Sequence, residues 1–386
     1  MESAAPSDRP TIPRSGTTAN SASKHPPFWR MALGALRDGG PGTCHFSITN
    51  LCNAACGFCS FARDTLPKAA QRSVTLDEAK LASDILKRNG IQFLHFNGGE
   101  PLMHPDCVAM IAHAAQIGLF PALDTNGALL TPKRIDALVE AGLAKVCISL
   151  DAASSTAHDA NRGLPGLTDR IRRANAAFKQ YKIPTTASVT MSRLVDYAAL
   201  PAMVQDLGFG ALTFSYPNRT LASTYLAYAE SPLVDFTPEE LHASFESIKA
   251  LRAHFPVLNP IASIEDMQRH LRGETELFGC LAGWKYFYLD WNLDIWRCHN
   301  WDRPLCNIRE FDSTKRIRDG CTACMIDCYR DDSVMQHIGV ALSDGMHAAV
   351  RGDLRQAWRH WIDRRNWISL RAAMGTAKAW LRVPTK

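Results

Sequence analysis

The sequence predicts an α/β fold built on a partial parallel barrel. Between about Gly42 and Tyr216, six short strand-like runs alternate with helical patterns. Alternation of this kind predicts parallel strands joined by right-handed crossovers. Six such units make most of a barrel but not the eight of a complete one. A cysteine-rich segment and a basic, tryptophan-rich tail follow, so we expect a small second domain and a helical extension.

The expected elements follow one another in strand–helix order. The strand-like runs lie at 44–49, 93–98, 121–127, 145–151, 185–190 and 211–217. The helical patterns between them cover 76–89, 107–116, 132–140, 169–181 and 197–207. Two helix starts carry capping signals, since Glu78 follows Thr75 by three residues and Pro132 follows Thr131. Beyond the barrel we expect helices at about 239–255 and 263–272, and then a hairpin over 284–298 with Asn292 and Leu293 near its tip.

Composition narrows the class of protein. The 386 residues are 46% hydrophobic and carry a net charge of +5, enough apolar content for a real core. No run reaches the roughly 18 apolar residues of a transmembrane helix. Residues 1–28 are rich in Ser, Ala, Pro and Thr and lack the apolar run of a secretory signal, so we expect a disordered leader. The expected location is the cytoplasm, where thiols stay reduced, and the twelve cysteines are interpreted as metal ligands or buried thiols. The scattered Cys44, Cys107 and Cys147 are predicted to be small core residues.

Cys52, Cys56 and Cys59 form a compact group directly after the first predicted strand. Structural zinc takes four closed ligands, whereas three thiolates leave a coordination position open. In a cubane iron–sulfur cluster, three cysteines leave one iron without a protein ligand, and a substrate can bind there. A zinc site completed by a distant ligand is the structural alternative.

This spacing resembles the hallmark of the radical S-adenosylmethionine (SAM) enzymes, C-x3-C-x-aromatic-C, in which Phe58 supplies the aromatic residue. The resemblance continues through the six predicted strands, about 45–216. It implies a partial (β/α)6 barrel whose three cysteines hold a [4Fe–4S] cluster, with SAM chelating the open iron. It also implies the chemistry, in which reductive cleavage of SAM yields a 5′-deoxyadenosyl radical that abstracts hydrogen from a substrate.

Motifs at later strand ends extend the resemblance. The stretch "NGGEP" resembles the family's GGEP motif, which implies that Gly98, Gly99 and Glu100 bind the SAM amino group. Glycines let a backbone come close to a ligand, and a carboxylate suits an ammonium group. The stretches "DTNG" (124–127) and "SLDA" (149–152) match the third and fourth strand ends, where related enzymes contact SAM.

Three more residues are implied to contact SAM. The resemblance places Ser149 and Asp151 near the ribose hydroxyls, and Arg162 near the SAM carboxylate. The alternatives are a solvated loop position for Arg162 and a helix cap for Asp151.

A second group of six cysteines falls late in the chain, at Cys280, Cys298, Cys306, Cys321, Cys324 and Cys328. This segment resembles the SPASM and shorter twitch auxiliary-cluster domains of the same superfamily. Because the full SPASM pattern is absent, the resemblance implies one auxiliary [4Fe–4S] cluster on Cys280, Cys298, Cys321 and Cys324. Cys328 is a further candidate ligand, and either it or Cys306 could replace one of the four. A zinc site on the same residues is the alternative.

The tail over 351–386 carries nine Lys and Arg against two Asp, and four of the nine Trp. Leu354, Trp358, Trp361 and Ile362 fall on one helical face. Basic amphipathic helices rich in Trp suit the membrane interface, so a peripheral contact with the inner membrane face is one interpretation. Packing of the Trp face against the barrel is the other. Nucleic-acid binding is disfavoured because the aromatic residues lie on the apolar face.

Three functions are weighed. The first is a radical SAM enzyme that acts on a small-molecule or lipid substrate, with an auxiliary cluster that assists oxidation or bond formation. The second keeps this chemistry on a peptide, as in maturases of ribosomal peptides or sulfatases. The third is a non-catalytic metal-binding scaffold, against which the GGEP motif speaks. An enzyme of this type also requires a reducing partner such as flavodoxin or ferredoxin.

The predicted domains are a leader (1–28), a barrel (29–230), a helical connector (231–275), an auxiliary-cluster domain (276–330) and a helical tail (331–386). Four polar residues around the expected hairpin could face the barrel mouth but are interpreted first as structural: Tyr286, Asp290, Asp294 and His299.

Overall fold

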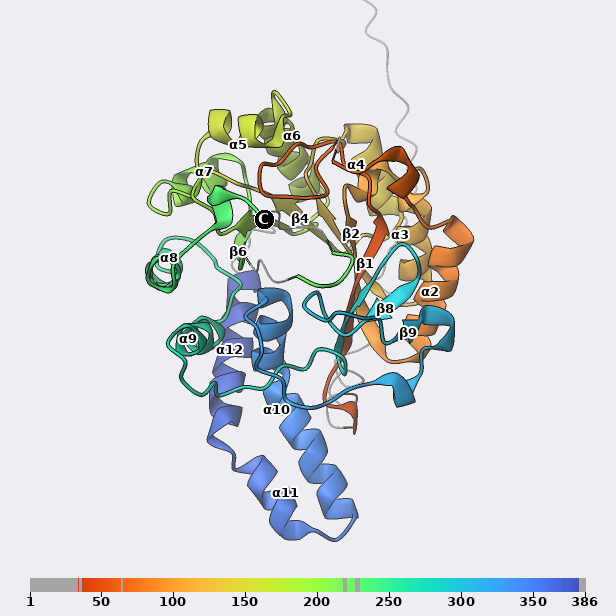
Figure 1. Ribbon diagram of the computed structural model, residues 1–386, viewed down its shortest axis with the longest axis vertical. Coiled ribbons are helices and arrows are strands. Elements are labelled where there is room, and N and C mark those ends of the chain that lie inside the picture. Colours follow the sequence, from red (N-terminus) through yellow and green to blue (C-terminus); the bar gives the residue numbers. More distant parts are fainter. Residues whose placement is uncertain (1–33, 35–36, 64, 218–220, 226–229, 382–386) are drawn as a thin grey trace, which may run out of the picture.

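The computed structural model describes residues 34, 37–63, 65–217, 221–225 and 230–381 (Figure 1). The predicted leader, 1–28, lies outside these residues.

Six parallel strands form the barrel part of the fold. They are β1 (Gly42–Thr49), β2 (Ile91–Gly98), β3 (Phe120–Thr125), β4 (Lys145–Ser149), β5 (Thr185–Thr190) and β6 (Ala211–Ser215). Each strand pairs in parallel with the next one in chain order. The predicted α/β partial barrel is confirmed, and every observed strand overlaps the run predicted for it.

Helices connect these strands. They are α2 (Leu76–Arg88), α3 (Cys107–Gln116), α4 (Pro132–Glu140), α5 (Ser155–Arg162), α6 (Leu167–Gln180) and α7 (Leu200–Asp206). The sequence predicted one helix between β4 and β5, whereas the structure has two. Gly163, at φ +59°, ends α5, and α6 begins after Gly166, at φ +72°. Glycine adopts these left-handed conformations without steric cost, which explains the break.

Both predicted helix starts are present. At α2 the Thr75 side chain accepts a hydrogen bond from Glu78 N, and the Glu78 carboxylate accepts one from Thr75 N, which completes a capping box. At α4 the Thr131 hydroxyl accepts from Arg134 N, with Pro132 at the first helical position.

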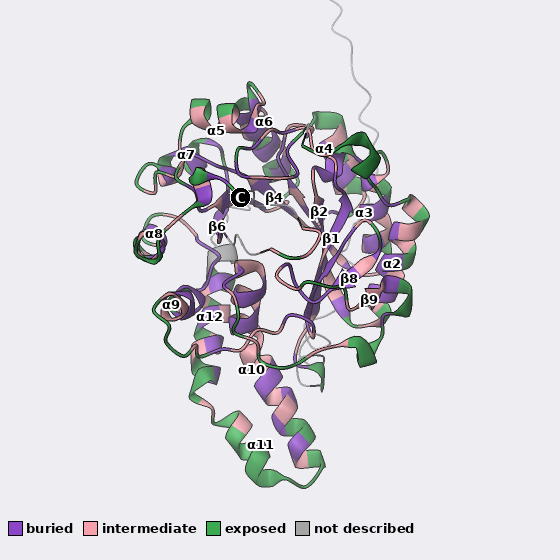
Figure 2. Cartoon of the chain, in the orientation of Figure 1, coloured by how far each residue is buried: buried purple, intermediate pink, exposed green. Residues whose placement is uncertain are grey.

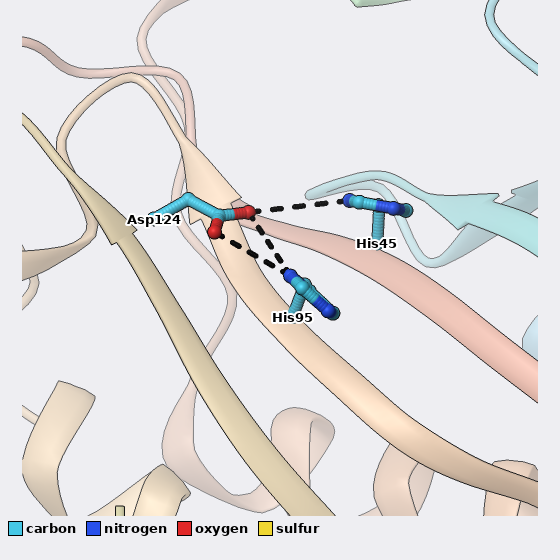
Figure 3. Close-up of side chains that lie close together, drawn as sticks. All are labelled: His45, His95 and Asp124. Carbon is cyan, nitrogen blue, oxygen red and sulfur yellow. Dashed lines mark hydrogen bonds and ion pairs between the residues drawn. The ribbon is translucent and has the colours of Figure 1, made fainter. Parts of the chain in front are cut away.

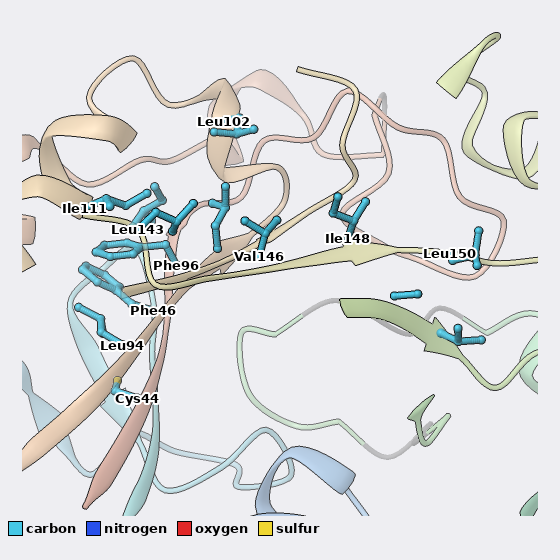
Figure 4. Packing of buried hydrophobic residues seen from close by; sticks show 14 of the residues in the cluster. Cys44, Phe46, Leu94, Phe96, Leu102, Ile111, Leu143, Val146, Ile148 and Leu150 are labelled. Carbon is cyan, nitrogen blue, oxygen red and sulfur yellow. The ribbon is translucent and has the colours of Figure 1, made fainter. Parts of the chain in front are cut away.

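The main core lies between the sheet and these helices. Figure 4 shows part of it, with Phe46 and Phe96 from neighbouring strands and Ile111 from α3 among the fully buried side chains. Cys44 and Cys107 belong to the same cluster, at 0% and 2% exposure. Both are therefore the small core residues that the sequence predicted.

The cysteine-rich segment continues the same sheet. Its strands are β7 (Tyr286–Leu289), β8 (Asp294–Trp296) and β9 (Cys306–Asn307). β7 pairs in parallel with β1, and β8 and β9 follow antiparallel. Leu293, at φ +64°, makes the turn of the predicted hairpin. The barrel and the hairpin thus share backbone hydrogen bonds, while the domain boundaries given above stay predictions.

Longer helices complete the chain. They are α8 (Pro238–Leu251), α9 (Ile261–Leu271), α10 (Asp327–Val350), α11 (Leu354–Trp361) and α12 (Arg364–Leu381). Short 3-10 turns lie at Lys68–Ala70, Pro101–Met103, Pro232–Val234, Ile308–Glu310 and Ser313–Lys315. The distal part of α10 and all of α11 extend away from the body of the molecule, and α12 returns beside α10 (Figure 1). In the described part of the chain, no helix has the length and apolar character needed to cross a bilayer.

Candidate active site

A cavity of about 400 Å³ occupies the inner face of the barrel. Each of the six barrel strands contributes a polar lining residue, namely His45, His95, Asp124, Lys145, Ser188 and Thr213. Cys52, Cys56 and Cys59 line the cavity too, and Ile326, Asp327 and Cys328 reach it from the start of α10. The cavity therefore joins the early cysteine group to the edge of the late one.

The loop that follows β1 carries Cys52, Cys56 and Cys59, and α5 holds it in place. The amide of Ala55 donates to the Arg162 carbonyl at 2.8 Å, and the amide of Gly57 donates to Asn161 Oδ1 at 3.3 Å. Phe58, only 4% exposed, packs beside Cys56 in a small apolar cluster and also lines the cavity.

The three thiols suit a cluster that binds each of them through a different iron. Burial raises the pKa of Cys56 to about 11 and that of Cys59 to about 12. Without metal they are protonated at neutral pH, and coordination would deprotonate them. In the described part of the chain, one group of three His, Cys, Asp or Glu residues has ligand atoms that all lie within 4.8 Å of one another. The three cysteines are not in that group, so their sulfur atoms are spaced more widely. The wider spacing of the thiols favours a cluster over a single zinc ion.

Gly98 and Gly99 let the end of β2 pass directly against the beginning of the cysteine loop. A Cβ atom at Gly98 would overlap the carbonyl oxygen of Thr49, and one at Gly99 would overlap that of Leu51. The amide of Gly99 donates to the Thr49 carbonyl at 2.9 Å. Both glycines line the cavity, so their backbone is open to a ligand there.

Glu100 lies behind the cavity wall, with 0% exposure. Its Oε1 accepts from the Thr125 hydroxyl at 2.7 Å and from Leu102 N at 3.0 Å, and its Oε2 accepts from Asn126 N at 2.7 Å. Burial raises the pKa of Glu100, although these bonds favour the carboxylate. In this structure Glu100 fixes the "DTNG" strand end, and a direct contact with SAM stays a prediction.

Ser149 and Arg162 line the cavity, whereas Asp151 lies behind them with 0% exposure. Arg162 donates to Asp151 from Nε at 2.7 Å and from Nη2 at 2.5 Å. Burial opposes ionisation of Asp151, but the Arg162 guanidinium lowers its pKa below the usual range. Asp151 is thus in place to orient Arg162, and its contact with the ribose stays a prediction.

The late cysteines gather at the start of α10. Cys298 forms an apolar cluster with Cys280, Cys324 and Cys328. The amide of Cys280 donates to the Cys321 carbonyl at 2.8 Å. The pKa of Cys298 is raised to about 12, mainly by burial and further by the charges of the neighbouring Cys324 and Cys280. The four cysteines predicted for the auxiliary cluster are brought together, and Cys328 lies beside them.

Cys306 lies apart from this group. It is on β9, where it pairs with Ile295 of β8, and it packs against the main core. Burial raises its pKa, and the charges that act on it are those of Lys315 and nearby carboxylates rather than another cysteine.

The sequence did not single out a polar group on the wall of the cavity, formed by His45, His95 and Asp124, whose side chains point toward one another (Figure 3). His95 Nδ1 lies 3.4 Å from Asp124 Oδ1, and His45 Nδ1 lies 4.0 Å from Asp124 Oδ2. Burial lowers the pKa of His45 to about 3. Burial would raise that of Asp124, but His95 brings it to about 2. A neutral imidazole beside a carboxylate can hydrogen-bond a substrate or bind a divalent ion.

His299 also reaches the cavity, where its ring stacks on that of Tyr225 at 3.8 Å between centroids. Asp290, by contrast, organises the hairpin, since it accepts from the Asn292 amide and the Trp296 indole. Tyr286 is buried and donates to the Asp332 carbonyl at 3.2 Å. Of the four polar hairpin residues considered from the sequence, His299 is the one that lines the cavity, so it is the one that could contact a substrate.

Comparison with known proteins identifies the family of the barrel. Residues 46–204 match the Radical SAM superfamily. The chain carries a radical SAM domain. The match confirms the predicted radical SAM domain of the barrel, with the fold, the SAM-binding [4Fe–4S] cluster and the enzyme class that this family implies.

Curated relatives of the radical SAM domain include two kinds of enzyme. AdoMet-dependent heme synthase of Oleidesulfovibrio alaskensis is 32% identical over 183 residues, 46% of each chain. PqqA peptide cyclase of Rhodopseudomonas palustris is 32% identical over 146 residues, 38% of each chain. The chain thus spans less than half the length of these relatives.

Solved structures share the architecture. Streptococcus suis SuiB bound to its precursor peptide SuiA has a TM-score of 0.55 and 14% identity, over 70% of this chain and 63% of SuiB. The enzyme anSMEcpe with bound AdoMet and the Cp18Cys peptide has a TM-score of 0.52 and 14% identity, over 85% of this chain and 99% of that one. At these identities the likeness shows the fold alone.

Proposed function

We propose that this chain is a radical SAM enzyme that oxidises or cross-links a peptide. The observation that carries the proposal is one cavity lined both by Cys52, Cys56 and Cys59 and by Cys328, which packs with the late cysteines, so a substrate there would lie next to both groups. The sequence favoured a small-molecule or lipid substrate over a peptide. The PqqA peptide cyclases and the peptide-bound SuiB and anSMEcpe structures support the peptide instead.

When bound, the [4Fe–4S] cluster and SAM supply a 5′-deoxyadenosyl radical that takes a hydrogen atom from the substrate. Cys52, Cys56 and Cys59 would hold that cluster, and Cys280, Cys298, Cys321 and Cys324 would hold an auxiliary one. An auxiliary cluster beside the cavity suits oxidation or bond formation, because the substrate must lose an electron after it loses hydrogen.

The residues of the chain position the reactants and exclude water. The cavity-lining backbone of Gly98 and Gly99 would bind SAM closely, and Asp151 would hold Arg162 toward it. The group of His45, His95 and Asp124 would hydrogen-bond the substrate deeper in the cavity. Enclosure by the barrel and by the start of α10 limits competing hydrogen donors. Flavodoxin or ferredoxin as the electron donor and a cytoplasmic location remain part of the proposal.

The test is the formation of 5′-deoxyadenosine by the full chain, reconstituted anaerobically with iron and sulfide. PqqA and SuiA peptides serve as peptide probes, and a haem precursor serves as the contrasting probe. We expect a peptide to increase 5′-deoxyadenosine formation and to lose hydrogen, seen by mass spectrometry. A Cys52/Cys56/Cys59→Ala variant is the control. Stimulation by the haem precursor alone would overturn the peptide proposal in favour of a small molecule.

A further inference from the structure

The hairpin of α10 and α11 ends in an exposed apolar surface, which we call the tip and define as residues 346–367. It is the part of the fold farthest below the barrel in Figure 1, and α11 is mostly exposed in Figure 2. The proposed activity does not use these residues.

Large apolar side chains are exposed together at the tip. Val350 is 83% exposed, and on α11 Leu354 is 69%, Trp358 is 61% and Ile362 is 59% exposed. Trp367, at the start of α12, is 67% exposed. Single exposed apolar residues are common, but a contiguous group of this size marks an interaction surface. The Trp face does not pack on the barrel, which was one of the two interpretations of the sequence.

Trp361 and Ala357 fix α11 on α10, whereas the apolar residues beside them stay uncovered. The Trp361 indole occupies the space left by Gly345, where a Cβ atom would overlap it, and its Nε1 donates to the Leu342 carbonyl at 3.5 Å. Ala357 is fully buried on the same side of α11. Leu354 and Trp358 lie on the same half of α11 as these two residues. Both remain mostly exposed, so α10 covers Ala357 but leaves these two apolar side chains open.

Arginines border the outward apolar strip. Arg355 and Arg359 follow Leu354 and Trp358 by one position and are exposed on the adjoining face of α11. The segment 351–371 holds six arginines against two aspartates. Both aspartates are engaged, Asp353 as the cap of α11 and Asp363 in an ion pair with Arg365 at 2.6 Å.

A basic surface pocket lies between α10 and α11 at the tip. Its lining residues include His347, Arg351, Gln356 and His360. The lining carboxylate, Asp344, is neutralised by Arg318 at 2.6 Å. This combination of basic and amide donors suits a phosphate group.

We propose that the tip docks on an anionic phospholipid membrane. Apolar side chains would enter the headgroup region while the bordering arginines meet anionic headgroups, as in interfacial helices. Charge decides against the other occupants. A second copy of the chain is disfavoured because two tips would bring arginines against arginines. A nucleic acid is disfavoured because the exposed Trp and Leu lie beside the basic face, whereas nucleic-acid-binding surfaces place aromatic residues among the basic ones.

Vesicle co-sedimentation of the full chain tests the proposal. The probes are phosphatidylcholine vesicles with and without phosphatidylglycerol. We expect binding to the anionic vesicles alone, weakened by salt. Arg355→Glu/Arg359→Glu and Leu354→Ser/Trp358→Ser should each lower the partition coefficient by about tenfold or more. Arg173→Glu/Lys179→Glu, on the exposed face of α6, is the matched control and should bind like the unchanged protein.

Two results would overturn the proposal. One is no binding to anionic vesicles, or binding that the tip variants leave unchanged. The other is a concentration-dependent dimer in light scattering that the tip variants abolish, which would assign the surface to a second copy. Since the substituted side chains are exposed, iron content and circular dichroism should stay constant and exclude misfolding as the cause.

Discussion

Arg162 donates two hydrogen bonds to Asp151, at 2.7 and 2.5 Å, and its carbonyl accepts from Ala55 in the cysteine loop. One buried ion pair thereby connects the end of β4, the end of α5 and the loop that carries Cys52, Cys56 and Cys59. The geometry of the proposed SAM site depends on this pair, although only Arg162 lines the cavity.

Asp151→Asn should lower the free energy of unfolding by about 3–5 kcal/mol, because it leaves the buried Arg162 charge without its partner. Denaturant unfolding of the metal-free chain measures the change. Asp206→Asn is the matched control, since it breaks the exposed pair between Arg172 and Asp206 and should cost less than about 1 kcal/mol. Equal losses in the two variants would contradict the structural role of Asp151.

His158 should make stability depend on pH. It is 0% exposed, and burial lowers its pKa from 6.5 to about 4, although Asp151 partly opposes this. The unfolded chain therefore binds more protons between these values, so stability is fully present above pH 6.5 and is lost as pH falls toward 4. The slope contributed by one group is at most about 1.4 kcal/mol per pH unit.

His158→Asn should flatten that slope, because an amide oxygen can replace Nδ1 as the acceptor for the Asp151 amide. Unfolding curves at several pH values between 5 and 7 provide the measurement. His254→Asn, at an exposed position, should leave the slope unchanged. An unchanged slope in His158→Asn would show that this histidine is not the group responsible.

Iron content should separate the late cysteines by position. The reconstituted chain should hold about eight irons, and Cys321→Ala/Cys324→Ala should reduce this to about four. Cys306→Ala should retain all of them, because Cys306 lies on β9 away from the group around Cys298. Iron loss in Cys306→Ala, or zinc in place of iron, would refute the proposed ligand set.

The sequence was most informative where local pattern determines structure. Strand–helix alternation predicted all six barrel strands. Gly98 and Gly99 were predicted to let the backbone approach a ligand, and the structure shows that they also let it approach the carbonyls of Thr49 and Leu51. His45 and His95 carried a usable signal as well. Alternate strand residues face opposite sides, so with Cys44 and Phe46 in the core, His45 had to face the cavity.

Other features depend on contacts between distant parts of the chain. Asp327 reaches the cavity because α10 packs beside β6, where its carboxylate accepts from Tyr216 N at 2.8 Å across 111 positions. No local pattern reports such a contact. The hydrogen bonds of Glu100 and Asp151 to neighbouring residues could not be predicted for the same reason. A motif identifies the residue at a position, but it does not identify the residues that its side chain contacts.

Glu100 distinguishes positioning from direct contact. The two carboxylate oxygens of Glu100 accept hydrogen bonds from Thr125, Leu102 and Asn126. In Glu100→Gln an amide NH₂ group takes the place of one of these oxygens, so a hydrogen-bond donor then faces another donor. We expect a loss of about 1–3 kcal/mol in unfolding free energy. SAM affinity, measured by equilibrium dialysis on the reconstituted protein, should fall as well.

Thr125→Val separates the two roles of Glu100, because it removes one hydrogen bond and keeps the carboxylate. If Glu100 acts by fixing the "DTNG" strand end, Thr125→Val should weaken SAM binding in the same direction as Glu100→Gln. Glu240→Gln, in the exposed capping box of α8, should leave SAM binding unchanged. Normal affinity in Thr125→Val beside a large loss in Glu100→Gln would instead support a direct bond from the Glu100 carboxylate to the SAM amino group, because the charge alone would then account for the loss.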